Sequence, residues 1–188
     1  MAADGGAATA LAFGFQPDVV VGDLDSISAS VLAELRRRDI PIETHPRDKD
    51  ATDGQLAIER ALLVQPTGLW LLGFLGGPRL DQALASVFLL ARLGTPAVLF
   101  DARNECRLLL AGTQHTWVPE PNELISLLAL SADVAGVHTR GLRWPLNGDR
   151  LVFGDTRGVS NEPDAREASV SIEQGQLLVT RHFPDPAP

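Results

Sequence analysis

The sequence predicts an α/β fold in its first half and a β-rich second half. Up to about residue 104, short apolar runs alternate with helical patterns, which is typical of a mostly parallel sheet flanked by helices, as in Rossmann-like folds. From Glu105 onward, short strand-like runs follow one another with Gly, Pro, Asn and Asp between them, which indicates a β-sandwich or β-roll. We therefore expect two domains, residues 1–104 and 105–188.

The first half contains four predicted strands and three predicted helices. The β-branched or leucine-rich runs that predict strands are Asp18–Gly22, Ile40–Thr44, Leu69–Phe74 and Ala97–Phe100. The helical patterns are Ser30–Arg38, Thr52 to about Val64, and Leu80–Leu93. Thr52 and Gln55 fit a capping box, in which a hydroxyl residue is followed three positions later by Glu or Gln. Gly94 is the expected C-cap of the third helix.

The second half contains only strand-like runs. They are Leu108–Leu110, His115–Val118, Leu124–Leu130, Gly136–Thr139, Arg150–Phe153, Ala168–Ile172 and Gln176–Thr180. The dipeptide Asn147-Gly148 predicts a hairpin turn, because both residues readily adopt positive φ.

Composition excludes several classes of protein. A net charge of −8 over 188 residues argues against binding to nucleic acid or to an anionic membrane surface. Cys106 is the only cysteine, so we expect no disulfide framework and a reducing, cytoplasmic location. The apolar runs are too short for a membrane helix, which needs about 18 residues. The four histidines are scattered, which favours structural or surface roles for His45, His115, His138 and His182.

Aspartates gather after three of the predicted strands. Asp23 and Asp25 follow the first strand, and the second and third are followed by Asp48, Asp50, Asp53 and Asp81. The carboxyl ends of parallel strands meet at one edge of a sheet, where such folds place their ligands. Clustered carboxylates repel one another unless a cation neutralises them, and Mg²⁺ prefers oxygen ligands. Arg47, Lys49 and Arg79 lie in the same loops, so the pattern predicts a magnesium–polyphosphate site.

Helix capping is the competing explanation for these aspartates. Asp25 and Asp81 are candidates for helix N-caps, and Asp53 suits the first turn of a helix. The two explanations are compatible, because helix N-termini present N–H groups to phosphates. The sequence contains neither a Walker A loop nor a dinucleotide-binding fingerprint.

Six segments, in this order, resemble the motifs of thiamine pyrophosphokinases. They are Asp4–Gly6, Gly22–Ile27, Asp48–Asp53, Gly77–Gln82, Gly141–Leu146 and Gly158–Glu162. The resemblance implies a Mg²⁺-dependent homodimer whose active site forms where the two domains meet across the dimer. It also implies attack of the thiamine hydroxyl on the β-phosphorus of ATP, with release of AMP.

The resemblance also assigns roles to residues. Asp23, Asp25 and Asp53 are expected to hold Mg²⁺ and position the diphosphate, and Asp53 is a candidate acceptor of the hydroxyl proton. The residues expected to bind the nucleotide are Lys49, Asp50, Arg79, Asp81 and Gln82. Those expected to bind thiamine are Ser160, Asn161 and Trp144.

Two departures from the family pattern leave alternatives open. Bacterial members usually carry His where this chain has Gln82, and family members have a strand and a helix before the segment that begins here at Asp4. We therefore expect either a start upstream of Met1 or a trimmed, Rossmann-like domain that is incomplete at its N-terminus. The competing functions are a hydroxymethylpterin diphosphokinase, a non-catalytic thiamine- or nucleotide-binding homologue, and an acidic structural protein.

Overall fold

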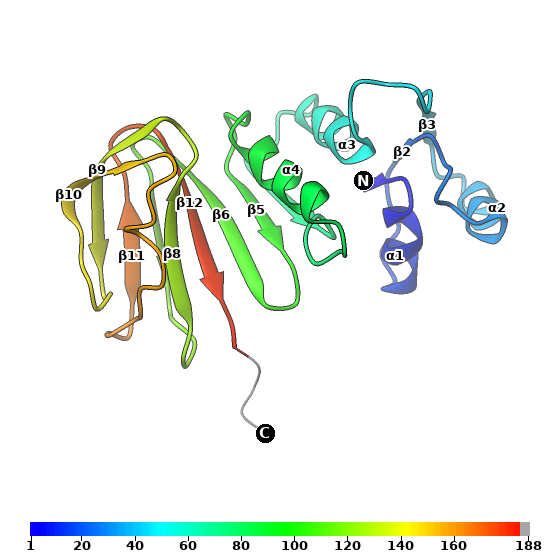
Figure 1. Ribbon diagram of the computed structural model, residues 1–188. Coiled ribbons are helices and arrows are strands. Elements are labelled where there is room, and N and C mark those ends of the chain that lie inside the picture. Colours follow the sequence, from blue (N-terminus) through cyan, green and yellow to red (C-terminus); the bar gives the residue numbers. More distant parts are fainter. Residues whose placement is uncertain (185–188) are drawn as a thin grey trace. The chain divides into compact units, whose positions relative to one another are not determined.

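The computed structural model describes residues 1–184 (Figure 1). The chain divides into two compact units, Met1–Pro66 and Thr67–Pro188. Among the described residues, no helix is long and apolar enough to cross a membrane. The mixed α/β composition agrees with the predicted fold class.

The first unit is a small parallel sheet with helices on both faces. Its strands lie in the order β1-β2-β3, and their bounds are Ala2–Ala3, Val20–Gly22 and Ile42–Thr44. Its helices are α1 (Gly6–Ala12), α2 (Ala29–Arg37) and α3 (Asp53–Leu62). Ser28 caps α2 and Thr52 caps α3, each through a side-chain oxygen that accepts a backbone N–H bond.

Alternation along β2 explains the two helical layers. Val20 is fully buried and packs with Ala7 of α1 and Leu35 of α2. Val21, which points to the opposite face, packs with Ala57 of α3. The chain before Val20 also supplies β1 and α1, which the sequence patterns did not predict. The two-residue β1 carries no β-branched residue, and α1 is only about two turns of Gly, Ala, Thr and Leu.

In its described residues, 67–184, the second unit contains two sheets and one helix. The five-stranded sheet has the order β4-β5-β6-β12-β8, with bounds Leu69–Leu72, Ala97–Phe100, Asn104–Leu110, Gln176–His182 and Leu124–Ala129. The four-stranded sheet has the order β10-β9-β11-β7, with bounds Asn147–Val152, Asp133–Arg140, Ala168–Ser171 and Gln114–Trp117. Helix α4 (Leu80–Leu90) connects the parallel strands β4 and β5.

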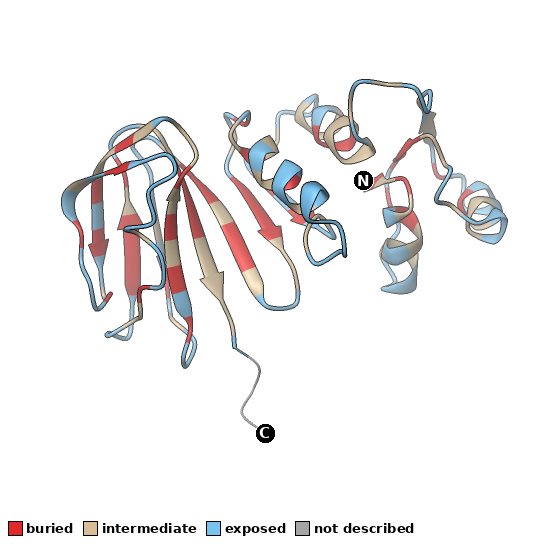
Figure 2. Ribbon diagram, viewed as in Figure 1, coloured by how far each residue is buried: buried red, intermediate tan, exposed pale blue. Residues whose placement is uncertain are grey.

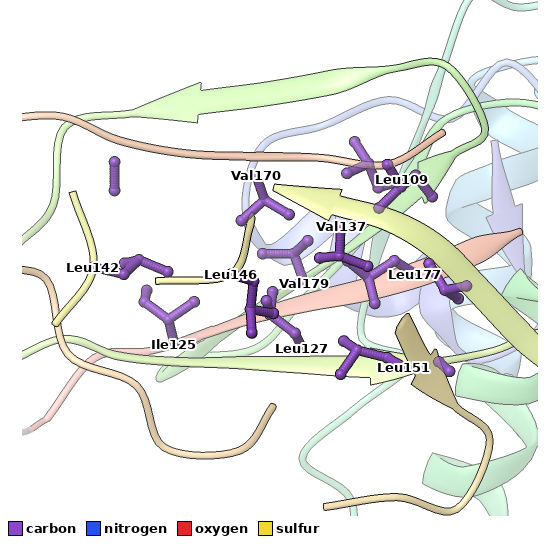
Figure 3. Packing of buried hydrophobic residues seen from close by; sticks show 14 of the residues in the cluster. Leu109, Ile125, Leu127, Val137, Leu142, Leu146, Leu151, Val170, Leu177 and Val179 are labelled. Atoms are coloured by element: carbon purple, nitrogen blue, oxygen red, sulfur yellow. The ribbon is translucent and has the colours of Figure 1, made fainter. Parts of the chain in front are cut away.

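One hydrophobic core is shared by the two sheets, which therefore form a sandwich (Figure 3). Ile125, Leu177 and Val179 come from the five-stranded sheet, and Val137 and Val170 come from the four-stranded sheet. All five side chains are fully buried. Buried residues recur along the strands of both sheets, whereas exposed residues cover much of α4 (Figure 2).

Strand direction changes at the turn between β5 and β6. Asp101 Oδ1 accepts hydrogen bonds from Arg103 N and Asn104 N, both at 2.7 Å, and β6 returns antiparallel to β5. The parallel pairings of the first half thus belong to two sheets, β1-β2-β3 and the β4-β5 pair. The Rossmann-like description and the division at residue 104 stay predictions.

Two local predictions are wrong. Asn147-Gly148 is not a hairpin turn but lies inside β10, where the register with β9 shifts and Gly148 has φ +79°. Gly148 therefore adopts its positive φ at a β-bulge. The connection between β9 and β10 is residues 141–146. Helix α4 ends at Leu90 with Ala91 as its C-cap, so Gly94 lies beyond the cap.

Candidate functional site

Three aspartates form a carboxylate cluster in the first unit. Oxygen atoms of Asp4, Asp23 and Asp53 all lie within 4.8 Å of one another. Asp4 follows β1, Asp23 follows β2, and Asp53 is the first residue of α3. The cluster thus lies at the carboxyl ends of parallel strands, as the sequence predicted for Asp23 and Asp53.

Backbone pairing brings these carboxylates together. Strands β1 and β2 are parallel and in register, and Asp4 N donates to Val21 O at 2.9 Å. Gly22 makes room for the approach, because a Cβ atom at this position would lie 2.9 Å from Asp4 Cβ and 3.2 Å from Asp53 Oδ1. Only glycine fits here without displacing one of the two carboxylates.

Lys49 provides the positive charge beside the cluster. Its Nζ donates to Asp23 Oδ2 at 3.0 Å and forms an ion pair with Asp53 Oδ1 at 2.9 Å. The hydrogen bond from Lys49 and a second one from Asp25 N hold the pKa of Asp23 below its usual value. The two carboxylates, Asp53 foremost, raise the pKa of Lys49. Lys49 therefore stays charged and Asp23 stays ionised over the physiological range.

The cluster contains a buried carboxylate oxygen, Oδ1 of Asp4, with neither a donor nor a cation beside it among the described residues. Asp4 is 8% exposed; its Oδ2 accepts a hydrogen bond from Ser26 Oγ, but its Oδ1 has no hydrogen-bond partner among the described residues. Asp53 Oδ1 is also buried, but the Lys49 ammonium lies 2.9 Å from it. Buried acceptors of this kind are costly unless a cation or a donor approaches them. The donor set therefore fits a hard divalent cation such as Mg²⁺.

Asp25 and Asp50 lie outside this cluster. The Asp25 side chain is 51% exposed, and its carboxylate lies 3.6 Å from Arg47 Nε. Asp50 is exposed. Neither Asp25 nor Asp81 is a helix N-cap, because Ser28 and Arg79 occupy those positions in α2 and α4. The third carboxylate of the cluster is that of Asp4, where the sequence predicted Asp25. In the sequence, Asp4 was singled out only because the segment Asp4–Gly6 resembles a family motif.

Residues predicted to bind the nucleotide also occur at the start of α4, in the second unit. Arg79 Nε and Nη2 donate to the two carboxylate oxygens of Asp81, at 3.1 and 2.5 Å. This bidentate pair lowers the pKa of Asp81 and raises that of Arg79, although both side chains are exposed. The neighbouring Gln82 is exposed, and its carbonyl accepts a hydrogen bond from Ser86 Oγ at 2.8 Å.

The three residues predicted to bind thiamine line one cavity of the second unit. Its volume is about 420 Å³, and Trp144, Ser160 and Asn161 share its wall with apolar groups of Leu127 and Val159. Trp144 is 53% exposed, and the Arg143 guanidinium lies 4.9 Å from the centre of the indole ring. The cavity thus combines an aromatic wall with a few polar groups, as is usual in small-molecule sites.

Pairing with β8 fixes the loop that carries Ser160 and Asn161. Asn161 exchanges two backbone hydrogen bonds with Ile125, at 2.7 and 2.8 Å. At Gly158 a Cβ atom would collide with Leu127 O, so this position admits only glycine. Ser160 adopts φ +62°, and its backbone N donates to Ser126 Oγ at 3.1 Å.

Comparisons with known proteins identify the family of the chain. Residues 1–99 match the family model described as "Thiamin pyrophosphokinase, catalytic domain", and residues 115–177 match "Thiamin pyrophosphokinase, vitamin B1 binding domain". The chain is 28% identical over 181 residues to thiamine pyrophosphokinase of Bacillus subtilis, covering 95% of this chain and 84% of that protein.

Solved structures show the same relationship. A crystal structure of thiamine pyrophosphokinase from Bacillus subtilis is similar with a TM-score of 0.83 and 27% identity, over 96% of this chain and 85% of that one. A thiamin pyrophosphokinase from Geobacillus thermodenitrificans is similar with a TM-score of 0.81 and 28% identity, over 98% and 86%. The chain belongs to the thiamine pyrophosphokinase family.

Proposed function

We propose that this protein transfers a diphosphate group from ATP to the hydroxyl of thiamine, giving thiamine diphosphate and AMP. Membership of the family supports the reaction, and the observation that carries it in this chain is the cluster of Asp4, Asp23 and Asp53 beside Lys49. In the reaction, the hydroxyl oxygen forms a bond to the β-phosphorus of ATP. The bond from that phosphorus to the oxygen bridging to the α-phosphate breaks, and AMP leaves.

Asp4, Asp23 and Asp53 would hold Mg²⁺, with Asp25 as the ligand that the resemblance adds. When bound, Mg²⁺ would neutralise charge on the polyphosphate. The buried Oδ1 of Asp4, which has no donor among the described residues, supports this role for Asp4. The backbone N of Asp25 also donates to Asp23 Oδ1 at 3.2 Å, which helps to orient the Asp23 carboxylate.

Lys49 and Asp53 have further proposed roles. Without a metal, Lys49 balances the charges of Asp23 and Asp53 and keeps them close together. Once a metal is bound, the Lys49 ammonium can contact a phosphate oxygen as a point charge. Asp53 is the proposed acceptor of the hydroxyl proton, because it is partly exposed at the N-terminus of α3. Most of the rate enhancement would come from positioning and charge neutralisation.

The remaining proposed contacts follow the family motifs. Asp50, Arg79, Asp81 and Gln82 are the proposed nucleotide contacts. The exposed Arg79 guanidinium supports this role, because it can exchange its pairing with Asp81 for phosphate oxygens.

On the acceptor side, the cavity at Trp144 and Ser160 is the proposed thiamine site. The cationic thiazolium ring suits an aromatic wall. A homodimer and a cytoplasmic location complete the proposal; the resemblance supports the first, and the lone cysteine supports the second.

The test is the release of AMP from ATP and Mg²⁺ by the purified chain, with and without thiamine. We expect thiamine-dependent AMP and an equal amount of thiamine diphosphate. Asp23→Asn should lower the rate at least about 100-fold, because one negative ligand of the cluster is lost. The matched control is Asp39→Asn, an exposed aspartate with φ +52° that asparagine also tolerates. Release of AMP with a hydroxymethylpterin but not with thiamine, or thiamine binding without AMP, would contradict the proposal.

A further inference from the structure

A polar groove lies on the four-stranded sheet, and none of the residues given a role above lines it. Its volume is about 270 Å³, at the small end of ligand sites. The residues that line it are Gln114, His138, Thr139, Arg140, Asn147, Ser169 and Ser171, which come from all four strands. None is acidic, although the whole chain has 24 Asp and Glu residues and a net charge of −8.

Strand register explains why these side chains converge. Asn147 pairs with His138, His138 with Ser171, and Ser171 with Gln114, so four polar side chains form one row across the sheet. With neighbouring strands about 4.8 Å apart, the row spans roughly 14 Å. Ser169 and Arg140 pair in a second row on the same face, roughly 7 Å along the strands.

This face is the outer face of the sandwich. Val137 and Val170 are fully buried in the shared core, while the alternating His138 and Arg140 are exposed. The four strands that carry the rows lie in the order β10-β9-β11-β7. The bulge in β10 brings Gly148 against the His138 ring, with the imidazole 3.6 Å from the place of a Cβ atom.

The charges of the groove favour an anion. The backbone of Arg140 pairs with Ser169, but within residues 1–184 the guanidinium of Arg140 has no hydrogen bond or ion pair. His138 interacts electrostatically with Asp149, but the oxygens of that carboxylate already accept bonds from Asn147 N, at 2.7 Å, and from Arg157. The hydroxyls, amides, imidazole and guanidinium that remain can all donate hydrogen bonds.

We propose that this groove binds a small phosphate-type oxyanion. Arg140 supplies a permanent charge and a planar fork of donors that matches phosphate oxygens. Ser169 and Ser171 lie beside it on β11, His138 lies two residues before it on β9, and Asn147 lies beside His138 on β10. The proposal concerns a site other than the carboxylate cluster and does not rest on the proposed function.

The test is a titration of the full chain with inorganic phosphate at constant ionic strength, followed by backbone amide shifts in two-dimensional NMR. We expect saturable shifts at Ser169, Ser171 and His138. Arg140→Gln should weaken phosphate binding about tenfold, since a charged hydrogen bond is lost. Arg166→Gln, an exposed arginine of the same unit, is the matched control and should bind like the unaltered chain. Asp23→Asn should also leave the titration unchanged, which separates this groove from the carboxylate cluster.

Four outcomes would overturn the proposal. Shifts that do not saturate would show only screening of charge. Equal weakening by Arg140→Gln and Arg166→Gln would show a general charge effect. Equal binding of acetate would remove the preference for phosphate. Shifts that follow protein concentration instead of phosphate would show that a second copy covers this face. Well-dispersed spectra of each variant exclude misfolding as the cause.

Discussion

The side-chain amide of Asn161 is hydrogen-bonded to both backbone polar groups of Trp144. Trp144 N donates to Asn161 Oδ1 at 3.1 Å, and Asn161 Nδ2 donates to Trp144 O at 2.7 Å. Asn161 Oδ1 also accepts a bond from Glu162 N at 2.9 Å, and the residue is only 9% exposed. Most of the hydrogen-bonding groups of this amide are therefore used within the protein. Asn161 is thus a positioning residue, which holds the backbone of Trp144 so that its side chain lines the cavity.

Replacing Asn161 with Asp should misplace Trp144. The carboxylate cannot donate to Trp144 O, and two acceptors would face each other in a nearly buried place. We expect the KM for thiamine to rise about tenfold with a smaller change in kcat, and the free energy of unfolding to fall by about 1–3 kcal/mol. Steady-state kinetics and urea denaturation measure the two effects.

Asn122→Asp is the matched control, because Asn122 is exposed and has a φ of +59° that both residues tolerate. It should leave both quantities unchanged. A rise in KM as large for Asn122→Asp as for Asn161→Asp would contradict the positioning role.

Gly22→Ala should disrupt the carboxylate cluster. The added methyl group would lie against Asp4 and Asp53, and φ at this position is +155°. We expect a loss of about 1–3 kcal/mol in stability from backbone strain and crowding, together with weaker divalent-cation binding. Thermal unfolding with and without Mg²⁺ gives both readouts.

Gly14→Ala is the comparison, since Gly14 has φ +79° but no atom within 4 Å of an added Cβ. It should show backbone strain alone and keep its response to Mg²⁺. Equal stabilisation of both variants by Mg²⁺ would contradict the packing role of Gly22.

Stability should fall as the pH is lowered from about 7 to 4, and His115 should contribute. Burial, helped by Arg107, lowers the pKa of His115 to about 4. The unfolded chain therefore binds a proton near pH 6.5 that the folded chain does not bind until about pH 4. The resulting loss in the free energy of unfolding is about 1–2 kcal/mol. It is smaller than the full difference in pKa implies, because the ring is partly exposed and water screens its charge.

His115→Phe keeps a ring in place of the imidazole that stacks on Trp117 at 5.2 Å, but it removes the titration. Its stability should change less than that of the unaltered chain between about pH 7 and 4, as measured by urea denaturation at each pH. An unchanged pH dependence would show that another group is responsible.

Local sequence signals predicted most of the strands and helices. Strand β5 has the predicted bounds, and Thr52 caps α3 as the capping box indicated, because both signals depend on neighbouring residues. The wrong assignment of Asn147-Gly148 shows the limit of such signals. Pairing with β9 decides there that the positive φ of Gly148 lies in a bulge and not in a turn.

The sites depended more on tertiary pairing. Asp23, Lys49 and Asp53 were identified from strand ends and come together as predicted. The pattern of strand ends did not point to Asp4, because the strand before it has only two residues and forms by pairing with β2. The bonds from Asn161 to Trp144 join residues 17 positions apart, a distance over which periodicity carries no information.

Divalent-cation binding tests the central claim most directly, namely that Asp4, Asp23 and Asp53 form the metal site. Electron paramagnetic resonance of added Mn²⁺, without nucleotide, gives the affinity of the full chain and of the variants Asp4→Asn and Asp25→Asn. We predict that Asp4→Asn weakens binding at least about tenfold, since a buried carboxylate ligand is lost, and that Asp25→Asn changes it less than about threefold. Strong loss in Asp25→Asn with normal binding in Asp4→Asn would contradict the account and place the metal at the outer aspartate.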